Sequence, residues 1–432
     1  MESATSACRA HLPRTLLQLA AQSADLVFCS RKVPSGAGCQ AAPLRTRHRP
    51  HVSATVTAIT APAREISPKQ ESDPASTSGT PSLKRPPKAA SPAHTTTAKQ
   101  MEVIRSMDCW VEEELLGRYE HRVEFNWQPS DLLPSSSAED FVQQVTDLRT
   151  RSAELPDDFW VCLAGNTVSE EGLPNSSIML NTLDGTRDDS GADMTPWARW
   201  TRAWTGEESR HGKVLHQYLY LSGQVNMHAL EKTSQYLVNS GMDPKTENNP
   251  YLGFVYATFV ERATFLSHRV MAARAQELGD HRLAKICGVV AGDEKRHEIA
   301  YGSIVTKLMD LDPDGTILAF ADMMKKQMVM PAHMMQDGES PTLFMDYSEV
   351  AQRCGVYTSF NYADIVEHLV RYWKVRERRG LSPEAEAAQQ YLCKLPDRVR
   401  RLAERTLGRA KKGSPARVGK FSWVFNREVA LL

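Results

Sequence analysis

Residues 207–211 read Glu-Glu-Ser-Arg-His, and residues 293–297 read Asp-Glu-Lys-Arg-His, so both stretches contain the pattern Glu-x-x-His. Each stretch lies in a long segment whose apolar residues recur at helical spacing. Two residues three positions apart lie on the same face of a helix, so their side chains can reach one point. A carboxylate oxygen together with an imidazole nitrogen suits iron or manganese. The two stretches therefore predict helices that share a metal site.

Two further glutamates stand in apolar segments with helical spacing. Glu170 precedes a segment with Ile178 and Leu183, and Glu261 interrupts residues 254–265, which are otherwise almost uncharged. A carboxylate buried there without a partner would be costly. A single Glu-x-x-His is usually a solvated pair on a helix surface, but di-iron bundles combine two such pairs with one glutamate from each of two further helices. The predicted metal ligands are Glu170, Glu208, His211, Glu261, Glu294 and His297.

The rest of the chain after residue 97 also has helical texture, and proline is sparse within its long segments. We therefore predict an all-α fold, a ferritin-like di-iron helical bundle with additional helices. Strand-like alternation occurs only at residues 421–425, where we expect a short strand or hairpin. The expected helices are 139–152, 157–183, 195–222, 250–278, 281–311, 315–330, 346–354, 361–380 and 384–409.

Composition narrows the function. Residues 1–100 hold 13 Lys or Arg and 5 Asp or Glu, a net charge of +8, whereas residues 101–432 hold 39 and 47, a net charge of −8. The acidic balance of the second part argues against nucleic-acid binding. No apolar run approaches the length of a membrane span. The 8 cysteines form no CxxC pair, which makes zinc ribbons and Cys-ligated clusters poor candidates.

The first hundred residues differ from the rest of the chain. They are rich in Ser, Ala and Arg, poor in acidic residues, and hold 11 of the 24 prolines. One interpretation is an organelle transit peptide, which has this composition; the other is a disordered tail that carries no address. We expect residues 1–96 to be a transit peptide and disordered linker, and residues 97–432 to be the folded di-iron domain.

Longer strings around these residues resemble the soluble plastid acyl-[acyl-carrier-protein] (acyl-ACP) desaturases. The resemblance covers about residue 101 to the C-terminus, and its strings are far more specific than Glu-x-x-His. The longest string is Trp200-Thr-Arg-Ala-Trp-Thr-Gly-Glu-Glu-Ser-Arg-His-Gly212. Further strings are Tyr218–Gly223, Gly241–Pro244, Asn249–Phe254, Glu261–Phe265, Asp293–Glu298, Asp312–Thr316, Ala319–Met324 and Phe421–Trp423.

The resemblance implies that the six ligands hold two Fe²⁺ ions per subunit, with Glu208 and Glu294 bridging them. Glu171 and Glu207 stand beside ligands and are not expected to bind metal. Catalytic roles are implied for three residues. Thr264 would help to deliver protons or orient oxygen; alternatively, its hydroxyl bonds to its own helix backbone. Trp204 and Asp293 would lie between the surface and the irons, where they carry electrons or support His211; alternatively, they are ordinary packing.

The resemblance also implies an acyl channel, and the sequence departs from the family pattern near it. Ser209 stands where the family commonly has Asn, Gly172 where it has Ala, and residues 166–171 read Asn-Thr-Val-Ser-Glu-Glu. Residues 175–177 (Asn-Ser-Ser) also differ. These changes bear on chain length or double-bond position more than on the chemistry. The implied channel residues are Met179, Thr182, Leu183, Pro244, Gly253 and Phe254.

The implied activity is that of a stromal, chloroplast enzyme of fatty acid biosynthesis, an oxidoreductase that introduces a cis double bond, first of all at carbon 9 of stearoyl-ACP. O2 and electrons from reduced ferredoxin are its implied co-substrates, and a homodimer is the implied assembly. Alternatives are another chain length or position on the same scaffold, a ferritin-like protein that scavenges iron or oxygen, and a bundle that only binds acyl-ACP. Because ACP is acidic, a local basic surface should receive it. The candidates are Arg274, Arg282, Lys285, Arg400 and Arg401.

Overall fold

The computed structural model describes residues 94–410 and 417–432. The predicted transit peptide and most of the predicted linker lie outside these residues. Helices dominate the described part, which confirms the predicted all-α class. The helices are α2 (Ala98–Ser106), α3 (Asp108–Trp110), α4 (Phe141–Ser152), α5 (Asp157–Glu171), α6 (Leu173–Leu180), α7 (Pro196–Ser222), α8 (Met227–Ser240), α9 (Pro250–Glu277), α10 (His281–Leu311), α11 (Pro313–Lys326), α12 (Leu343–Arg353), α13 (Ser359–Tyr372) and α14 (Pro383–Ala410).

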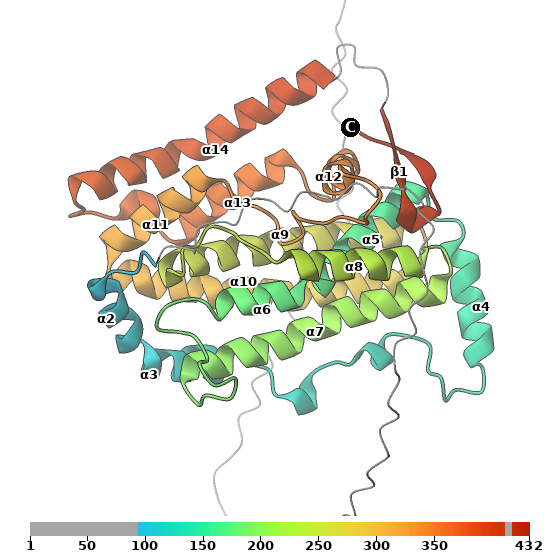
Figure 1. The fold of residues 1–432 in the computed structure, drawn as a ribbon, viewed down its shortest axis with the longest axis horizontal. Coiled ribbons are helices and arrows are strands. Elements are labelled where there is room, and N and C mark those ends of the chain that lie inside the picture. Colours follow the sequence, from blue (N-terminus) through green and yellow to red (C-terminus); the bar gives the residue numbers. More distant parts are fainter. Residues whose placement is uncertain (1–93, 411–416) are drawn as a thin grey trace, which may run out of the picture. The chain divides into compact units, whose positions relative to one another are not determined.

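The bundle at the centre consists of α5, α7, α9 and α10, the four helices that carry the predicted ligands. α9 packs along α10, α7 contacts α5 and α10, and α5 also contacts α9. Figure 1 shows α7, α9 and α10 running side by side with nearly parallel axes. No helix among the described residues is long and apolar enough to cross a membrane.

Local sequence signals fix where three of these helices begin. Thr195 and Asn249 accept hydrogen bonds from backbone N–H groups in the first turns of α7 and α9, and Pro196 and Pro250 follow them. Asp280 caps α10 in the same way. Polar caps satisfy N–H groups that have no partner within the helix, and proline at the first position needs none. The caps therefore fix where α7, α9 and α10 begin, and with it the positions of the predicted ligands along these helices.

Burial explains the unusual composition of α9. All residues from 250 to 259 are buried, so both sides of this part of the helix face other elements. The helices α11 and α13 pack against α9, and α14 covers α11 and α13 (Figure 1). A helix surrounded in this way has no solvated face, which is why its sequence is apolar almost all round.

A short antiparallel hairpin lies near the C-terminus. Its strands are β1 (Val418–Phe421) and β2 (Arg427–Ala430), paired from Val418 with Ala430 to Phe421 with Arg427. The predicted hairpin is confirmed, but residues 421–425 are mostly its connection and not a strand, because Ser422–Val424 form a 3-10 turn. Phe425 and Asn426 have positive φ angles of 57° and 59°, so the chain reverses there and no strand can continue.

Two further expectations about helices are corrected. The helix expected over 157–183 is two helices, because it breaks at Gly172 and Pro174 follows in the first turn of α6. Proline lacks an N–H and crowds the preceding turn, which favours a new helix start near Pro174 over a continuation of α5. The helix expected over 361–380 ends at Tyr372. Helix α8 was not predicted; its buried face includes Thr233 and Ser234, which weaken the apolar signal.

Candidate metal centre and adjoining cavity

The six predicted ligands converge from four helices. Within each of two groups, one possible ligand atom from every residue lies within 4.8 Å of the others. Glu208 and Glu294 belong to both groups, which is the arrangement expected of bridging carboxylates. The first group is Glu170, Glu208, His211 and Glu294, and the second is Glu208, Glu261, Glu294 and His297.

The atoms that face one another in this cluster are poorly satisfied by the protein. His297 Nδ1 lies 2.6 Å from Glu208 Oε1, yet neither atom makes a properly directed hydrogen bond within the described residues. Glu294 Oε1 is also without one. His211 Nδ1 lies 3.1 Å from Glu208 Oε2 and 3.2 Å from Glu294 Oε1. Buried polar atoms without partners are expensive, so these residues fit a site built around cations.

The charges lead to the same inference. Burial, followed by repulsion from Glu208 and Glu294, raises the pKa of Glu261 well above its ordinary value. Burial and Glu294 also raise the pKa of Glu170. Four carboxylates share this buried space with two imidazoles, and two divalent cations would balance them. Mixed carboxylate and imidazole ligands suit both iron and manganese, so the ligand types alone do not distinguish the two metals.

Asp293 supports one of the ligands from outside the cluster. Its Oδ2 atom lies 3.3 Å from His211 Nε2 and accepts hydrogen bonds from Trp127 Nε1 (2.8 Å) and Arg210 Nη2 (3.0 Å). A carboxylate on the second nitrogen of an imidazole orients the ring and leaves the first nitrogen for metal. The Trp127 ring lies parallel to the His211 ring with centroids 6.1 Å apart.

Asp293 therefore contacts a tryptophan, but that tryptophan is Trp127 and not Trp204. Trp204 is buried on α7 and donates its Nε1 hydrogen to Glu261 Oε1 at 3.0 Å. Trp204 therefore contacts a predicted ligand directly, and its role in carrying electrons stays a prediction. Sequence reasoning missed Trp127, because it lies outside the long helices and no spacing links it to His211.

A third group of possible ligands, His121, Glu207 and Asp293, is better explained by ion pairing. Arg296 pairs with Glu207 and lies 2.9 Å from Asp293. Arg210 lies 3.0 Å from Asp293. The buried guanidinium group of Arg210 and the partly buried one of Arg296 already neutralise these carboxylates, so the group needs no metal.

The hydroxyl of Thr264 has three acceptors within reach. It lies 2.6 Å from Glu294 Oε2 and 3.0 and 3.1 Å from the backbone oxygens of Glu261 and Val260. A hydroxyl has one hydrogen to donate, so the two interpretations made from the sequence are both open, and the contact with a ligand is the shortest.

His268 is a site residue that sequence reasoning missed. Its Nε2 atom lies 2.7 Å from Glu170 Oε1, its ring is 1% exposed, and its Nδ1 atom has no hydrogen-bond partner among the described residues. It follows Glu261 by seven residues on α9, which is two turns and hence the same face. That spacing is the signal that could have found it.

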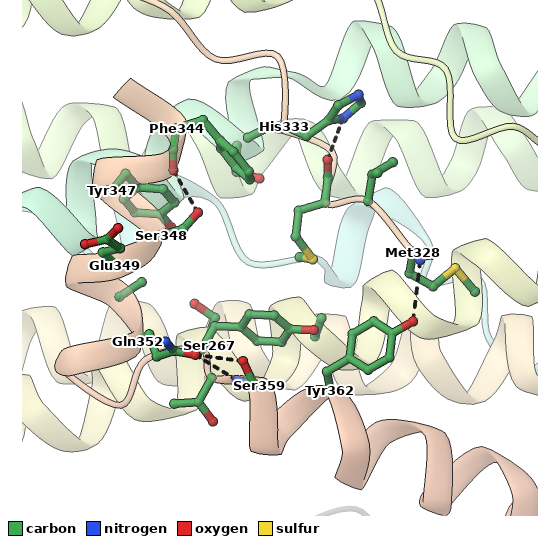
Figure 2. A pocket seen from close by; sticks show the side chains of 18 of the residues that line it. Ser267, Met328, His333, Phe344, Tyr347, Ser348, Glu349, Gln352, Ser359 and Tyr362 are labelled. Atoms are coloured by element: carbon green, nitrogen blue, oxygen red, sulfur yellow. Dashed lines mark hydrogen bonds between the residues drawn. The ribbon is translucent and has the colours of Figure 1, made fainter. Parts of the chain in front are cut away.

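A cavity of about 600 Å³ opens beside the cluster. Glu170, Thr264 and His268 line it next to the cluster, and most of its lining surface is apolar, with Met328, Phe344 and Tyr362 among the residues that supply it. Figure 2 shows Phe344, Tyr347 and Ser348 along α12 on one side of the pocket. On the other side in this view, the backbone N–H of Met328 donates to the hydroxyl of Tyr362. Apolar walls around a few polar groups are typical of a site for a largely apolar ligand.

None of the six predicted channel residues lines this cavity. Five of them are buried, and Thr182 is partly exposed. Leu183 packs on Gly253 so closely that a Cβ at Gly253 would lie 2.5 Å from Leu183 Cδ1. Phe254 stacks on Trp197 with ring centroids 5.2 Å apart. Met179, Leu183 and Phe254 belong to one hydrophobic core cluster, and the channel role of all six residues stays a prediction.

The candidate basic residues for ACP differ in how freely they face solvent. Arg400 pairs with Asp364 and Glu367, Arg274 pairs with Asp158, and Arg282 donates to the backbone oxygen of Leu132. Lys285 and Arg401 are exposed and form no ion pair with any described residue. Arg282 likewise forms no ion pair with a described residue, so Arg282, Lys285 and Arg401 are the three candidates whose charge remains for a partner.

Comparisons with known proteins identify the family of this chain. A family model described as fatty acid desaturase matches residues 99–425. The stearoyl-[acyl-carrier-protein] 9-desaturases of Brassica napus and Ricinus communis are each 55% identical over 338 residues, which cover 78% of this chain and 84% of theirs. The acyl-[acyl-carrier-protein] desaturase of Cucumis sativus is similar to the same extent.

A solved structure resembles the chain more weakly. The X-ray structure of DesA2 from Mycobacterium tuberculosis H37Rv covers 66% of this chain and 99% of its own, with 20% sequence identity and a TM-score of 0.42. The family is therefore established by sequence: the matched residues include all six predicted ligands, and the chain belongs to the acyl-[acyl-carrier-protein] desaturase family.

Proposed function

We propose that this chain introduces a cis double bond at carbon 9 of stearoyl-ACP, with O2 as oxidant and reduced ferredoxin as electron donor. The observation that carries the proposal is the six-residue cluster of buried carboxylates and imidazoles at the inner end of an apolar cavity. Relatives named stearoyl-ACP 9-desaturase at 55% identity support the substrate and the position.

The cluster would hold two iron ions. Glu208 and Glu294 would bridge them, Glu170 and His211 would complete one site, and Glu261 and His297 would complete the other. Iron bound there would supply the redox chemistry that activates O2, which zinc lacks. The donor set and the unpartnered buried atoms of Glu208, Glu294 and His297 support this assignment.

The side chains around the cluster have separable tasks. The apolar wall of the cavity binds the acyl chain and excludes water. Trp204 and His268 hold Glu261 and Glu170 by hydrogen bonds of 3.0 and 2.7 Å. Thr264 offers the proton of its hydroxyl to Glu294. We propose that the contact of Trp127 with Asp293, and of Asp293 with His211, forms the route by which electrons enter.

The partners and the location follow from the same proposal. Acidic ACP would dock near exposed Lys285 or Arg401, and the functional unit would be a homodimer in the chloroplast stroma. Names that include "chloroplastic" among the relatives support the compartment. A fusion of residues 1–96 to a fluorescent protein tests it: uptake into isolated chloroplasts with shortening of the fusion is expected, and a fusion that stays outside contradicts the assignment.

The experiment that tests the activity supplies 16:0-ACP and 18:0-ACP to the iron-loaded chain with reduced ferredoxin and O2. Mass spectrometry then locates any double bond. The expected product carries it at carbon 9 and forms preferentially from 18:0-ACP. Consumption of O2 without olefin from either substrate would overturn the proposal and favour an oxygen-scavenging protein.

A further inference from the structure

A chain of hydrogen bonds crosses the wall of the cavity close to the metal cluster. Tyr347 of α12 donates its hydroxyl to Asn166 Oδ1 at 2.9 Å, and Asn166 Nδ2 donates to Ser267 Oγ of α9 at 3.1 Å. All three residues line the cavity. Asn166 is only 5% exposed and lies four residues before Glu170, so the two share a face of α5.

Other contacts fix the ring of Tyr347 at the same place. It lies against the backbone of α5 at Gly165, where a Cβ atom would be only 2.1 Å from the ring. Any side chain at residue 165 would therefore push the ring, and α12 with it, away from α5. On another side, Trp423 meets the ring at 72° with centroids 6.3 Å apart.

The position of α12 sets the shape of the cavity. Seven residues of α12 between Phe344 and Gln352 line the cavity on one side (Figure 2). At its C-terminal end, α12 is tied to α5 by Arg353 and Asp158, whose atoms lie 3.0 Å apart. The bond from Tyr347 to Asn166 is the tie nearest to Glu170. A shift of this wall by the width of one methylene would change which carbons of a bound chain lie beside the ligands.

We propose that the bridge from Tyr347 to Asn166 determines the acyl specificity of this enzyme. This inference rests on the proposed function. The amide oxygen of Asn166 holds the hydroxyl of Tyr347, and Tyr347 in turn holds α12, which lines the cavity. The bridge also gives the side-chain amide of Asn166 a hydrogen-bond partner at the edge of the cavity. A bound acyl chain therefore contacts a wall that has no unpaired polar group at this point. Neither residue touches the reacting carbons in this account; both act through the wall.

Three variants test the bridge: Tyr347→Phe, Asn166→Leu and the double variant. The dissociation constants of 16:0-ACP and 18:0-ACP are measured with the iron-loaded chain without O2 or reductant, and the products are then compared under turnover. Because a single methylene in an apolar pocket is worth about 10–200-fold, we expect each single variant to reduce the preference between the two substrates about tenfold. The double variant should match the single ones, because all three remove the same interaction.

Tyr218→Phe is the matched control. It removes a buried tyrosine hydroxyl that donates to Asp280, and it does not line the cavity. Its thermal stability should fall while its substrate preference stays unchanged. The inference is overturned if folded bridge variants keep the wild-type preference within about twofold, if their effects add, or if the wild-type chain binds neither substrate. Failure of the proposed function looks different, because the wild-type chain then binds substrate and forms no olefin.

Discussion

Glu170 and Glu171 are neighbours in the chain with different surroundings. Glu170 faces the cluster and accepts a hydrogen bond from His268, whereas Glu171 pairs with His216 at 2.6 Å and accepts from Ser234 outside it. We expect Glu170→Gln to lower bound iron from about two ions per chain, the di-iron norm, to one or fewer. Glu171→Gln is the control and should keep both. Equal iron contents in the two variants, measured by elemental analysis, would contradict the assignment.

Thr264 gives a second test at this scale. Thr264→Val removes the hydroxyl but keeps the shape, so iron should stay bound while olefin formation falls by about 10²-fold, the lower end for a positioned proton donor. Thr264→Ser restores a hydroxyl and should recover most of the rate. If the valine variant turns over at the wild-type rate, the hydroxyl only bonds to the helix backbone.

The residues found from sequence share one property. The spacing of Glu-x-x-His within a single helix reveals Glu208 with His211 and Glu294 with His297, because local geometry alone brings each pair together. Trp127 could not be found in this way. It reaches the cluster through Asp293, a residue far along the chain, and only the packed structure brings the two together.

Among the elements, α9 has a point of close approach that a substitution can probe. Gly253→Ala would place a Cβ 2.5 Å from Leu183, so we expect a loss of about 1–3 kcal/mol in the free energy of unfolding, as overpacking usually costs. Gly206 lies exposed within α7 with nothing within 4 Å of a Cβ. Gly206→Ala should therefore be neutral or stabilising by up to about 1 kcal/mol. Urea denaturation checks both, and equal stabilities would contradict the packing described.

Elements were predictable where the sequence carries strong caps and a clear apolar stripe. Helices α7 and α10 have both, and α9 has a strong cap and a long apolar run. The observed bounds of all three lie within one or two residues of the expected ones. Helix α8 could not be predicted from its apolar pattern, because small polar residues pack on its buried side. The break at Gly172 was not predicted because the apolar pattern continues across it. Only the proline two residues later marks the start of α6.

For the molecule as a whole, Glu298 links stability to pH. Burial alone would raise its pKa, but His368, Lys295 and Arg262 outweigh burial and lower the pKa to about 2. A carboxylate whose pKa is lowered by folding stabilises the protein above its unfolded pKa of about 4.5, and this contribution is lost as the pH falls toward 2. The difference in unfolding free energy between the wild-type chain and Glu298→Gln should thus shrink over that range. A constant difference would show that these charges do not act on Glu298.

The cavity is the whole-molecule feature that the sequence did not reveal. Its wall combines α5, α9, α12, α13, α14 and the segment before α12, which are scattered over more than half of the chain. The resemblance implied channel roles for Leu183, Gly253 and Phe254, which do not line this cavity, and those roles stay predictions. A cavity depends on how distant elements meet, and periodicity within one element holds no information about it.

The central claim is that the six ligands form a two-iron centre that desaturates an acyl chain. The most direct test titrates iron into the metal-free chain and measures olefin formed from 18:0-ACP against the iron bound. The account predicts almost no olefin below one iron per chain and a plateau at about two, as a di-iron site requires. A plateau at one iron, or a fully loaded chain that forms no olefin, would contradict it.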